Sequence, residues 1–268
     1  MRKRGVDQAA GEIQRLFLLP ARDRSIHTSR FMKDQKIQTR NAQEESDRFH
    51  TDYYLTHDLF QQGTWLEKPN SRIMEIGALL ANQERVRALD LGAGVGRNAI
   101  PFARLFADGT ATVDCVDIID VAVEKLRANA LAQGVSRAIN PILSNVAEFH
   151  IPEGAYDAIM AMSVLEHAFA PERFEAGIAT LQTGTRKGGF NCLSITTDLK
   201  ERDCQTDQCL VPLITTAVSS QECRELLQRL YATWEIQHLS FSPFRETIER
   251  SGRNIEWSAN YCLLVARR

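Results

Sequence analysis

The stretch VRALDLGAGVGRNAIPFA, residues 86–103, decides the fold of this protein. A run of apolar residues that is typical of a buried strand leads through Asp90 into a turn. The turn has the spacing G-x-G-x-G at Gly92, Gly94 and Gly96, and a helical pattern follows it. Glycine permits positive φ and the close approach of a ligand, and a helix N-terminus presents free N–H groups to an anion. The sequence therefore predicts an anion site between a strand and a helix.

The spacing of these glycines indicates which of two kinds of anion the turn binds. A dinucleotide fingerprint, G-x-G-x-x-G, would place its third glycine where this sequence has Arg97. We therefore expect a smaller anion, such as a carboxylate, rather than a pyrophosphate. A nicotinamide-dependent oxidoreductase is the less favoured alternative, and it predicts binding of NAD.

The next predicted strand ends in an acid, Asp117, which lies 25 residues after Gly92. A carboxylate at this place can accept hydrogen bonds from both hydroxyls of an adenosine ribose. The alternative is that Asp117 caps the following helix. Asp120 lies nearer to the start of that helix and is the better candidate for the cap, so we assign Asp117 to the ribose.

Strand and helix patterns alternate along most of the remaining chain. Strands are predicted at residues 86–91, 111–118, 139–143, 156–164 and 190–196, and helices at 98–106, 121–132 and 174–181. The tail has a helix at 221–230 and then two strands, 233–241 and 256–266, separated by a polar loop. We expect an α/β, Rossmann-like fold: a seven-stranded, mostly parallel sheet with helices on both faces and an antiparallel hairpin at its C-terminal edge.

Composition and charge indicate a soluble globular protein. Of the 268 residues, 44% are hydrophobic and 25% are charged, and the net charge is −2. No apolar run approaches the roughly 18 residues that a transmembrane helix needs, and the start of the chain lacks the apolar core of a secretion signal. We therefore expect a cytoplasmic protein without a membrane partner, whose six cysteines are thiols.

The N-terminal segment differs from the rest in charge. Residues 1–40 contain ten Lys and Arg against four Asp and Glu, a local excess of +6. We expect residues 1–46 to form a loosely structured basic arm and residues 47–268 to form one domain. The arm is a solvated tail or a contact for nucleic acid or a partner protein, unless translation begins at Met32.

These motifs resemble the class I S-adenosylmethionine-dependent methyltransferases over residues 86–268, with a start of the likeness near residue 51. The run LDLGAGVGRN is similar to the glycine motif of that family, and VDCVDI is similar to its acidic strand end. YDAIMAMSVLEH resembles the fourth strand, and RKGGFNCLSI resembles the turn into the fifth. Ser144-Asn145-Val146 falls where the family contacts the adenine. The resemblance implies S-adenosyl-L-methionine as the cofactor.

The resemblance also implies a set of cofactor contacts. Gly92, Gly94 and Arg97 would hold the methionine end, and Asp117 the ribose. Ile118 and Val146 would enclose the adenine, unless they are ordinary core residues, and Asn145 would bond its edge. The full set of predicted cofactor residues is Asp90, Gly92, Gly94, Gly96, Arg97, Asp117, Ile118, Asn145, Val146 and Met162.

Within the class, the sequence is most similar to the tellurite-resistance (TehB-like) methyltransferases. The likeness rests on Gly96-Arg97-Asn98, on KGGFN at 187–191, on the ending CLLVARR and on Thr51-Asp52-x-Tyr54. That family carries a His-Arg pair in the hairpin before the last strand, whereas residues 245–250, RETIER, contain no His. The expected acceptor is a small molecule, with a tellurite- or selenite-type oxyanion as one candidate.

Two residues are predicted to act in catalysis. His167, at the end of the fourth strand, could accept a proton, or else be a hydrogen-bonded structural histidine. Arg250 could attract an oxyanion, together with the neighbouring Arg245 and Arg253. Cys204 and Cys209 lack the spacing of a structural zinc site, so no metal is expected, and their thiols are either ordinary loop residues or contacts for a soft metalloid.

The exit of the fourth strand, MSVLEH at 162–167, also bears on nucleic-acid substrates. It has neither the Asn/Asp-Pro-Pro-aromatic motif of amino-group methylases nor the Pro-Cys nucleophile of cytosine-carbon methylases, so nucleic acid is not the expected partner. The alternative is a nucleic-acid or protein binding module that keeps this fold and uses the basic arm. We expect a monomer or a homodimer.

Overall fold

The computed structural model describes residues 43–107, 109–250 and 252–268. Most of the predicted basic arm, residues 1–42, therefore lies outside the described residues. Residues 43–56 form one helix, which we call the N-terminal helix. The predicted domain boundary after residue 46 falls inside this helix.

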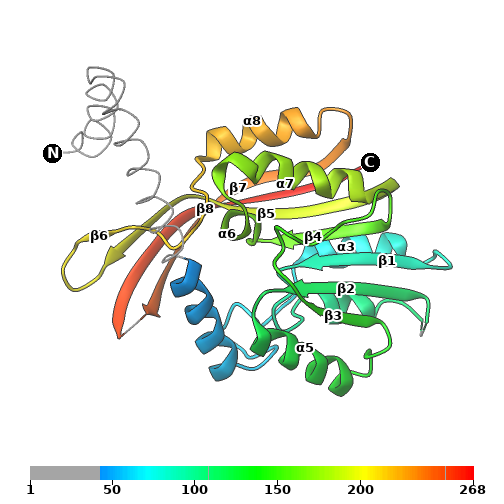
Figure 1. Cartoon of the computed structure of the whole chain (residues 1–268), viewed down its shortest axis with the longest axis horizontal. Coiled ribbons are helices and arrows are strands. Elements are labelled where there is room, and N and C mark those ends of the chain that lie inside the picture. Colours follow the sequence, from blue (N-terminus) through cyan, green and yellow to red (C-terminus); the bar gives the residue numbers. More distant parts are fainter. Residues whose placement is uncertain (1–42, 108, 251) are drawn as a thin grey trace, which may run out of the picture.

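One sheet runs through the molecule (Figure 1). Its main path has the order β3-β2-β1-β4-β5-β8-β7, and the short strand β6 pairs with β5 outside this path. The strands are β1 (Val86–Leu91), β2 (Ala111–Asp117), β3 (Ile139–Leu143), β4 (Tyr156–Met162), β5 (Thr185–Asp203), β6 (Cys209–Leu210), β7 (Glu235–Arg250) and β8 (Arg253–Arg267). Strands β1 to β5 pair in parallel, and β8 pairs antiparallel with β5 and β7. The predicted sheet is confirmed, with β6 as an addition.

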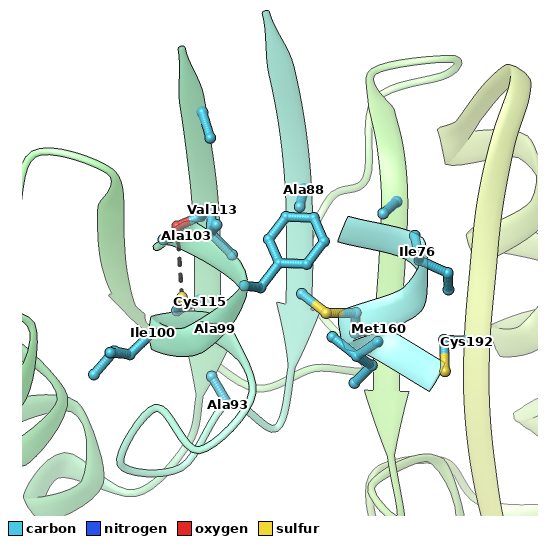
Figure 2. Close-up of a cluster of buried hydrophobic side chains, with 14 of the residues drawn as sticks. Ile76, Ala88, Ala93, Ala99, Ile100, Ala103, Val113, Cys115, Met160 and Cys192 are labelled. Carbon is cyan, nitrogen blue, oxygen red and sulfur yellow. Dashed lines mark hydrogen bonds between the residues drawn. The ribbon is translucent and has the colours of Figure 1, made fainter. Parts of the chain in front are cut away.

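Helices cover both faces of this sheet, as predicted. They are α3 (Ser71–Leu80), α4 (Ala99–Ala103), α5 (Asp120–Ala132), α6 (Leu165–Ala168), α7 (Pro171–Gly184) and α8 (Ser220–Leu230). Helices α3, α4 and α5 pack on one face and α7 and α8 on the other, because successive strand residues point to opposite sides. Figure 2 shows the first face, where Ile76 of α3 lies near Met160 of β4 and Cys192 of β5.

The C-terminal hairpin is longer than the sequence predicts. Residues 242–255 read as a polar loop, but β7 and β8 continue to pair from Phe241 and Cys262 out to Arg250 and Arg253. Strand β7 lies at the edge of the sheet, where polar side chains can face solvent and a proline such as Pro243 is tolerated. The extended part of β5, β7 and β8 projects beyond the rest of the sheet (Figure 1).

Two helices differ in smaller ways from the predicted elements. Helix α4 ends at Ala103, short of the predicted residue 106, and α6 is a single turn that the sequence pattern does not predict. All six cysteines are free. Among the described residues no helix combines the length and the apolar character that crossing a bilayer requires.

Candidate cofactor and acceptor site

A cavity of about 1820 Å³ lies at the carboxyl ends of the parallel strands. Strand β1 stands between β2 and β4, so the chain leaves β1 toward one side of the sheet and returns on the other. Ligands of open α/β sheets bind at such a reversal. The cavity reaches from the end of β2, past β4, to the hairpin of β7 and β8, and the N-terminal helix forms its opposite wall.

The glycine turn, residues 92–96, borders this cavity through two of its glycines. Gly92 and Gly94 have φ of +68° and +52°, in the left-handed region that favours glycine. A Cβ atom on Gly92 would lie 2.7 Å from Val164 Cγ2, and one on Gly94 would lie 2.7 Å from the Tyr54 hydroxyl. Neighbouring side chains therefore pack directly on the bare backbone of this turn.

Gly96 has a different role from the other two. It does not line the cavity. A Cβ there would lie 2.6 Å from Leu126 Cδ1 and 2.7 Å from Ile100 Cδ1, so the missing side chain lets α4 and α5 pack closely. The predicted cofactor contact at Gly96 is thus replaced by a packing role.

Asp117 is tied to the glycine turn, as the sequence suggests. Its buried carboxylate accepts from the Gly94 N–H at 2.8 Å through Oδ2 and from the Ile119 N–H at 2.9 Å through Oδ1. Burial raises the pKa of this carboxyl. Each carboxylate oxygen can accept a second hydrogen bond, so both can still receive a ribose hydroxyl. Ile119 is the N-cap of α5 and Asp120 its first residue, so neither aspartate occupies the cap position.

Three further predicted residues line the cavity next to Asp117. Ile118 is 45% exposed, which is unusual for so apolar a side chain. Val146 is buried in the core of the other sheet face and still reaches the cavity. Asn145 uses its Oδ1 to accept from the Ala147 N–H at 2.9 Å, which leaves its amide N–H groups as donors.

Of the other predicted cofactor residues, two line the cavity and one does not. Met162 and Arg97 line it, and the Arg97 guanidinium also donates to the Lys68 carbonyl at 3.4 Å. Asp90 lies behind the turn, where burial raises its pKa to about 7. Among the described residues its Oδ2 has no hydrogen-bond partner. The structure does not bring Asp90 to the cavity surface.

His167 lines the cavity, but its environment disfavours the predicted proton transfer. Burial, and then the nearby His50, lower the pKa of His167 to about 3. A ring with this pKa is a weak proton acceptor at neutral pH. Its neighbour Glu166 points away into the core, where its Oε1 accepts from the Thr196 N–H at 2.7 Å and burial raises its pKa to about 7.

Arg250 does not reach the cavity, contrary to the prediction of a catalytic role. Its side chain is buried, and Nη2 lies 2.7 Å from Glu201 Oε2 in an ion pair. The charge that would attract an oxyanion is therefore already neutralised inside the protein. Cys204 and Cys209 are exposed and do not line the cavity either.

Sequence reasoning missed the contribution of the N-terminal helix. Tyr54 is buried with its hydroxyl over Gly94, and His50, one turn earlier, lines the same cavity. Trp65 packs beside both rings. The spacing of His50 and Tyr54 by four residues places them on one helix face, which was the available signal.

The far wall of the cavity comes from β7 and β8, and it carries three aromatic side chains and one carboxylate. We call it the acceptor wall, and it consists of Phe244, Glu246, Ile248, Trp257 and Tyr261. Among the cavity-lining residues that the structure describes, only Arg97 and Arg173 are Lys or Arg. Both lie on the side of the glycine turn and Val146, since Arg173 donates to the Ala147 carbonyl at 3.4 Å.

Comparison with known proteins identifies the domain. Residues 88–189, which hold β1, the glycine turn and Asp117, match the family model of a methyltransferase domain. Residues 88–189 therefore form a methyltransferase domain. This match supports the predicted enzyme class and the predicted cofactor, S-adenosylmethionine.

Solved structures share the fold of this chain at low sequence identity. TehB from Haemophilus influenzae is 19% identical with a TM-score of 0.55, over 77% of this chain and 64% of that chain. The [4+2]-cyclase SpnF is 17% identical with a TM-score of 0.52, over 80% and 84% of the two chains. At these identities the likeness concerns the fold alone.

One curated relative matches in sequence. The tRNA N(3)-cytidine methyltransferase METTL2 of Xenopus tropicalis is 26% identical over 181 residues, which cover 62% of this chain and 50% of the relative. The methyltransferase thus spans about half the length of this relative.

Proposed function

We propose that this methyltransferase transfers a methyl group from S-adenosylmethionine to a small organic acceptor that binds against the acceptor wall. One observation carries the proposal: a single cavity connects Asp117 and Gly94 to Trp257 and Phe244. Pockets for one drug-sized ligand usually measure about 300–1,000 Å³. A cavity of about 1820 Å³ has room for an acceptor beside the cofactor.

The residues around the glycine turn suit the cofactor. The bare backbone at Gly92 and Gly94 and the Tyr54 hydroxyl would hold its amino-acid end, and the buried Asp117 would hold the ribose. Ile118 and Val146 would lie against the adenine. When bound, the sulfonium supplies an electrophilic methyl group, and the chain then has to align the acceptor and exclude water.

The lining of the acceptor side favours an uncharged or cationic molecule with aromatic character. Phe244, Trp257 and Tyr261 offer rings for stacking, and Glu246 adds a carboxylate. A tellurite- or selenite-type oxyanion would call for cationic or N–H donors, and the described acceptor wall contains neither Lys nor Arg. The pair of arginines that does line the cavity lies on the cofactor side.

A screen for S-adenosylhomocysteine formation tests this proposal. The wild-type chain would be assayed with phenols, aromatic amines, thiols, tellurite and selenite under identical conditions. We expect turnover with neutral aromatic acceptors, and a Trp257→Leu variant should raise KM for them by about tenfold, the loss expected for one aromatic contact. Turnover confined to tellurite or selenite would contradict the proposed acceptor class.

A second candidate, methylation of tRNA, is favoured by the similarity to METTL2 and by the basic residues 1–40. It predicts transfer to unmodified tRNA and an affinity that falls steeply with salt. A chain lacking residues 1–40 should then lose tRNA binding while it keeps S-adenosylhomocysteine binding. If neither chain methylates tRNA, the small-molecule proposal is favoured over this candidate.

A further inference from the structure

The N-terminal helix places a second histidine where the cofactor side and the acceptor side of the cavity meet. His50 lines the cavity, and its ring centroid lies 6.0 Å from that of His167 of α6. Its charge also affects the pKa of Asp117, on the other side of the glycine turn, so the ring lies within electrostatic reach of both groups.

Hydrogen bonding fixes which ring nitrogen of His50 carries the lone pair. Nδ1 lies 2.8 Å from the Ser46 carbonyl oxygen, one turn earlier in the helix. A carbonyl oxygen can only accept, so Nδ1 carries the proton, and the neutral ring has its lone pair on Nε2. The rings of Tyr54 and Trp65, at 6.2 and 6.3 Å between centroids, hold the imidazole from the sides.

The other titratable groups that face His50 are poorly suited to accept a proton or are already engaged. His167 of α6 has a pKa lowered to about 3, and Tyr54 on its own helix has a raised pKa. Asp117 of β2 receives two backbone N–H groups, and Asp47 receives the Gln43 amide at 2.7 Å. Glu246 of β7 is a further carboxyl group of the cavity, and burial raises its pKa. His50 adds a ring nitrogen with a lone pair where the cofactor side and the acceptor side meet.

We infer that His50 is the general base of the reaction, and that the acceptor is a protic nucleophile, a hydroxyl, thiol or protonated amine, rather than a ready anion. This inference rests on the proposed function. The acceptor heteroatom bonds to the methyl carbon while the carbon–sulfur bond breaks and its electron pair stays on sulfur. The acceptor proton passes to Nε2 of His50 and from there to water, so charge and atoms balance.

Two probes that differ in their need for a base test the inference. Phenol keeps its proton at neutral pH, whereas thiophenol is largely ionised. We expect His50→Gln to lower S-adenosylhomocysteine formation on phenol by about 10²–10⁴-fold, the usual contribution of a general base. On thiophenol the loss should stay below about tenfold. The pH profile of the wild-type rate on phenol should contain an acidic limb that the variant lacks.

His57→Gln is the matched control. His57 also bonds through Nδ1 to a carbonyl one turn earlier, that of Tyr53 at 3.1 Å, but it does not line the cavity. Its substitution should leave both rates unchanged. Equal losses on the two probes, or no loss on phenol, would overturn the role of His50.

A spectroscopic measurement decides the matter even if the wild type turns over neither probe. In the ¹⁵N-histidine spectrum of the full chain, His50 should show the Nδ1–H tautomer, and S-adenosylhomocysteine should shift its Nε2 signal. A protonated Nε2, or a signal that the ligand leaves in place, would refute the inference. If S-adenosylhomocysteine does not bind at all, the proposed function fails first, and the two failures are thereby distinguished.

Discussion

At the scale of single residues, the proposed cofactor site depends on the missing side chains of the glycine turn. Gly94 has φ of +52°, and the Tyr54 hydroxyl occupies the place where a Cβ would be. The same turn receives the carboxylate of Asp117 on its N–H. The site therefore depends on a close contact between three residues from three separate segments of the chain.

We predict that Gly94→Ala abolishes measurable binding of S-adenosylhomocysteine. The new methyl group would displace Tyr54 from the turn, in addition to the roughly 1–2 kcal/mol cost of a left-handed alanine. Gly134→Ala provides the control, because Gly134 has φ of +71° but open space around its Cβ position. It should lose similar stability in thermal unfolding and keep its affinity. Equal affinities of the two variants in calorimetric titration would contradict this account.

The elements of the fold were predictable to different degrees. Strands β1, β2 and β4 are buried on both faces and read as apolar runs, so their positions were correct within two residues. The outer half of β7 is mostly exposed and largely polar, and it therefore reads as a loop. Nothing in the local pattern around Arg250 reveals that its partner is Glu201, 49 residues away.

The residues of the candidate site were also predictable to different degrees. Gly92, Gly94 and Asp117 follow from motif spacing, because the turn and the next strand end are held together by the sheet itself. The roles of His50 and Tyr54 depend on where the N-terminal helix docks, and an isolated helical pattern does not determine that. The sequence pattern therefore does not determine how segments that are far apart in the chain pack against one another.

One buried carboxylate, that of Glu201 in β5, links the hairpin of β7 and β8 to the neighbouring segments of the cavity wall. Its Oε1 accepts from Trp257 Nε1 at 2.8 Å and from the Leu213 N–H at 3.2 Å, and Oε2 pairs with Arg250. Three segments that wall the acceptor side therefore meet at Glu201. Arg250 also lies 3.5 Å from Glu45 of the N-terminal helix.

We predict that Glu201→Gln destabilises the protein by about 3 kcal/mol, because it leaves the buried Arg250, among the described residues, with the more exposed Glu45 as its remaining charged partner. The double variant Glu201→Gln, Arg250→Met should recover part of this loss in denaturant unfolding. Binding of S-adenosylhomocysteine should stay within about twofold, since Glu201 does not line the main cavity. If Glu201→Gln affected cofactor affinity more than acceptor KM, this would contradict our account that Glu201 holds the segments of the acceptor side in place.

At the scale of the whole molecule, buried acids couple stability to pH. Burial raises the pKa of Glu166 from 4.5 to about 7 and that of Asp90 from 3.8 to about 7. Between the ordinary and the raised pKa of each acid, the folded state holds a proton that the unfolded chain has released. The free energy of unfolding therefore falls as pH rises from about 4 to about 7. His167 acts in the opposite direction, since its pKa is lowered from 6.5 to about 3.

We predict that Glu166→Gln is more stable relative to wild type at pH 8 than at pH 4.5. The carboxylate of Glu166 costs up to about 3 kcal/mol when it ionises inside the protein, and the amide avoids that cost. Gln can still accept from the Thr196 N–H. The exposed Glu84→Gln serves as the control for changes in surface charge. Urea unfolding across this pH range checks the prediction, and parallel curves for Glu166→Gln and wild type would rule it out.

The most direct test of the whole account is a calorimetric titration of the chain with S-adenosylmethionine and S-adenosylhomocysteine. We predict that both bind to the wild type, and that Asp117→Asn weakens each by about 1–3 kcal/mol, or roughly 5–150-fold in Kd. Asp120→Asn, an exposed acid at the start of α5, should bind like the wild type. A wild-type chain that binds neither ligand, or an Asp117→Asn variant with undiminished affinity, would contradict the placement of the cofactor between Asp117 and the glycine turn.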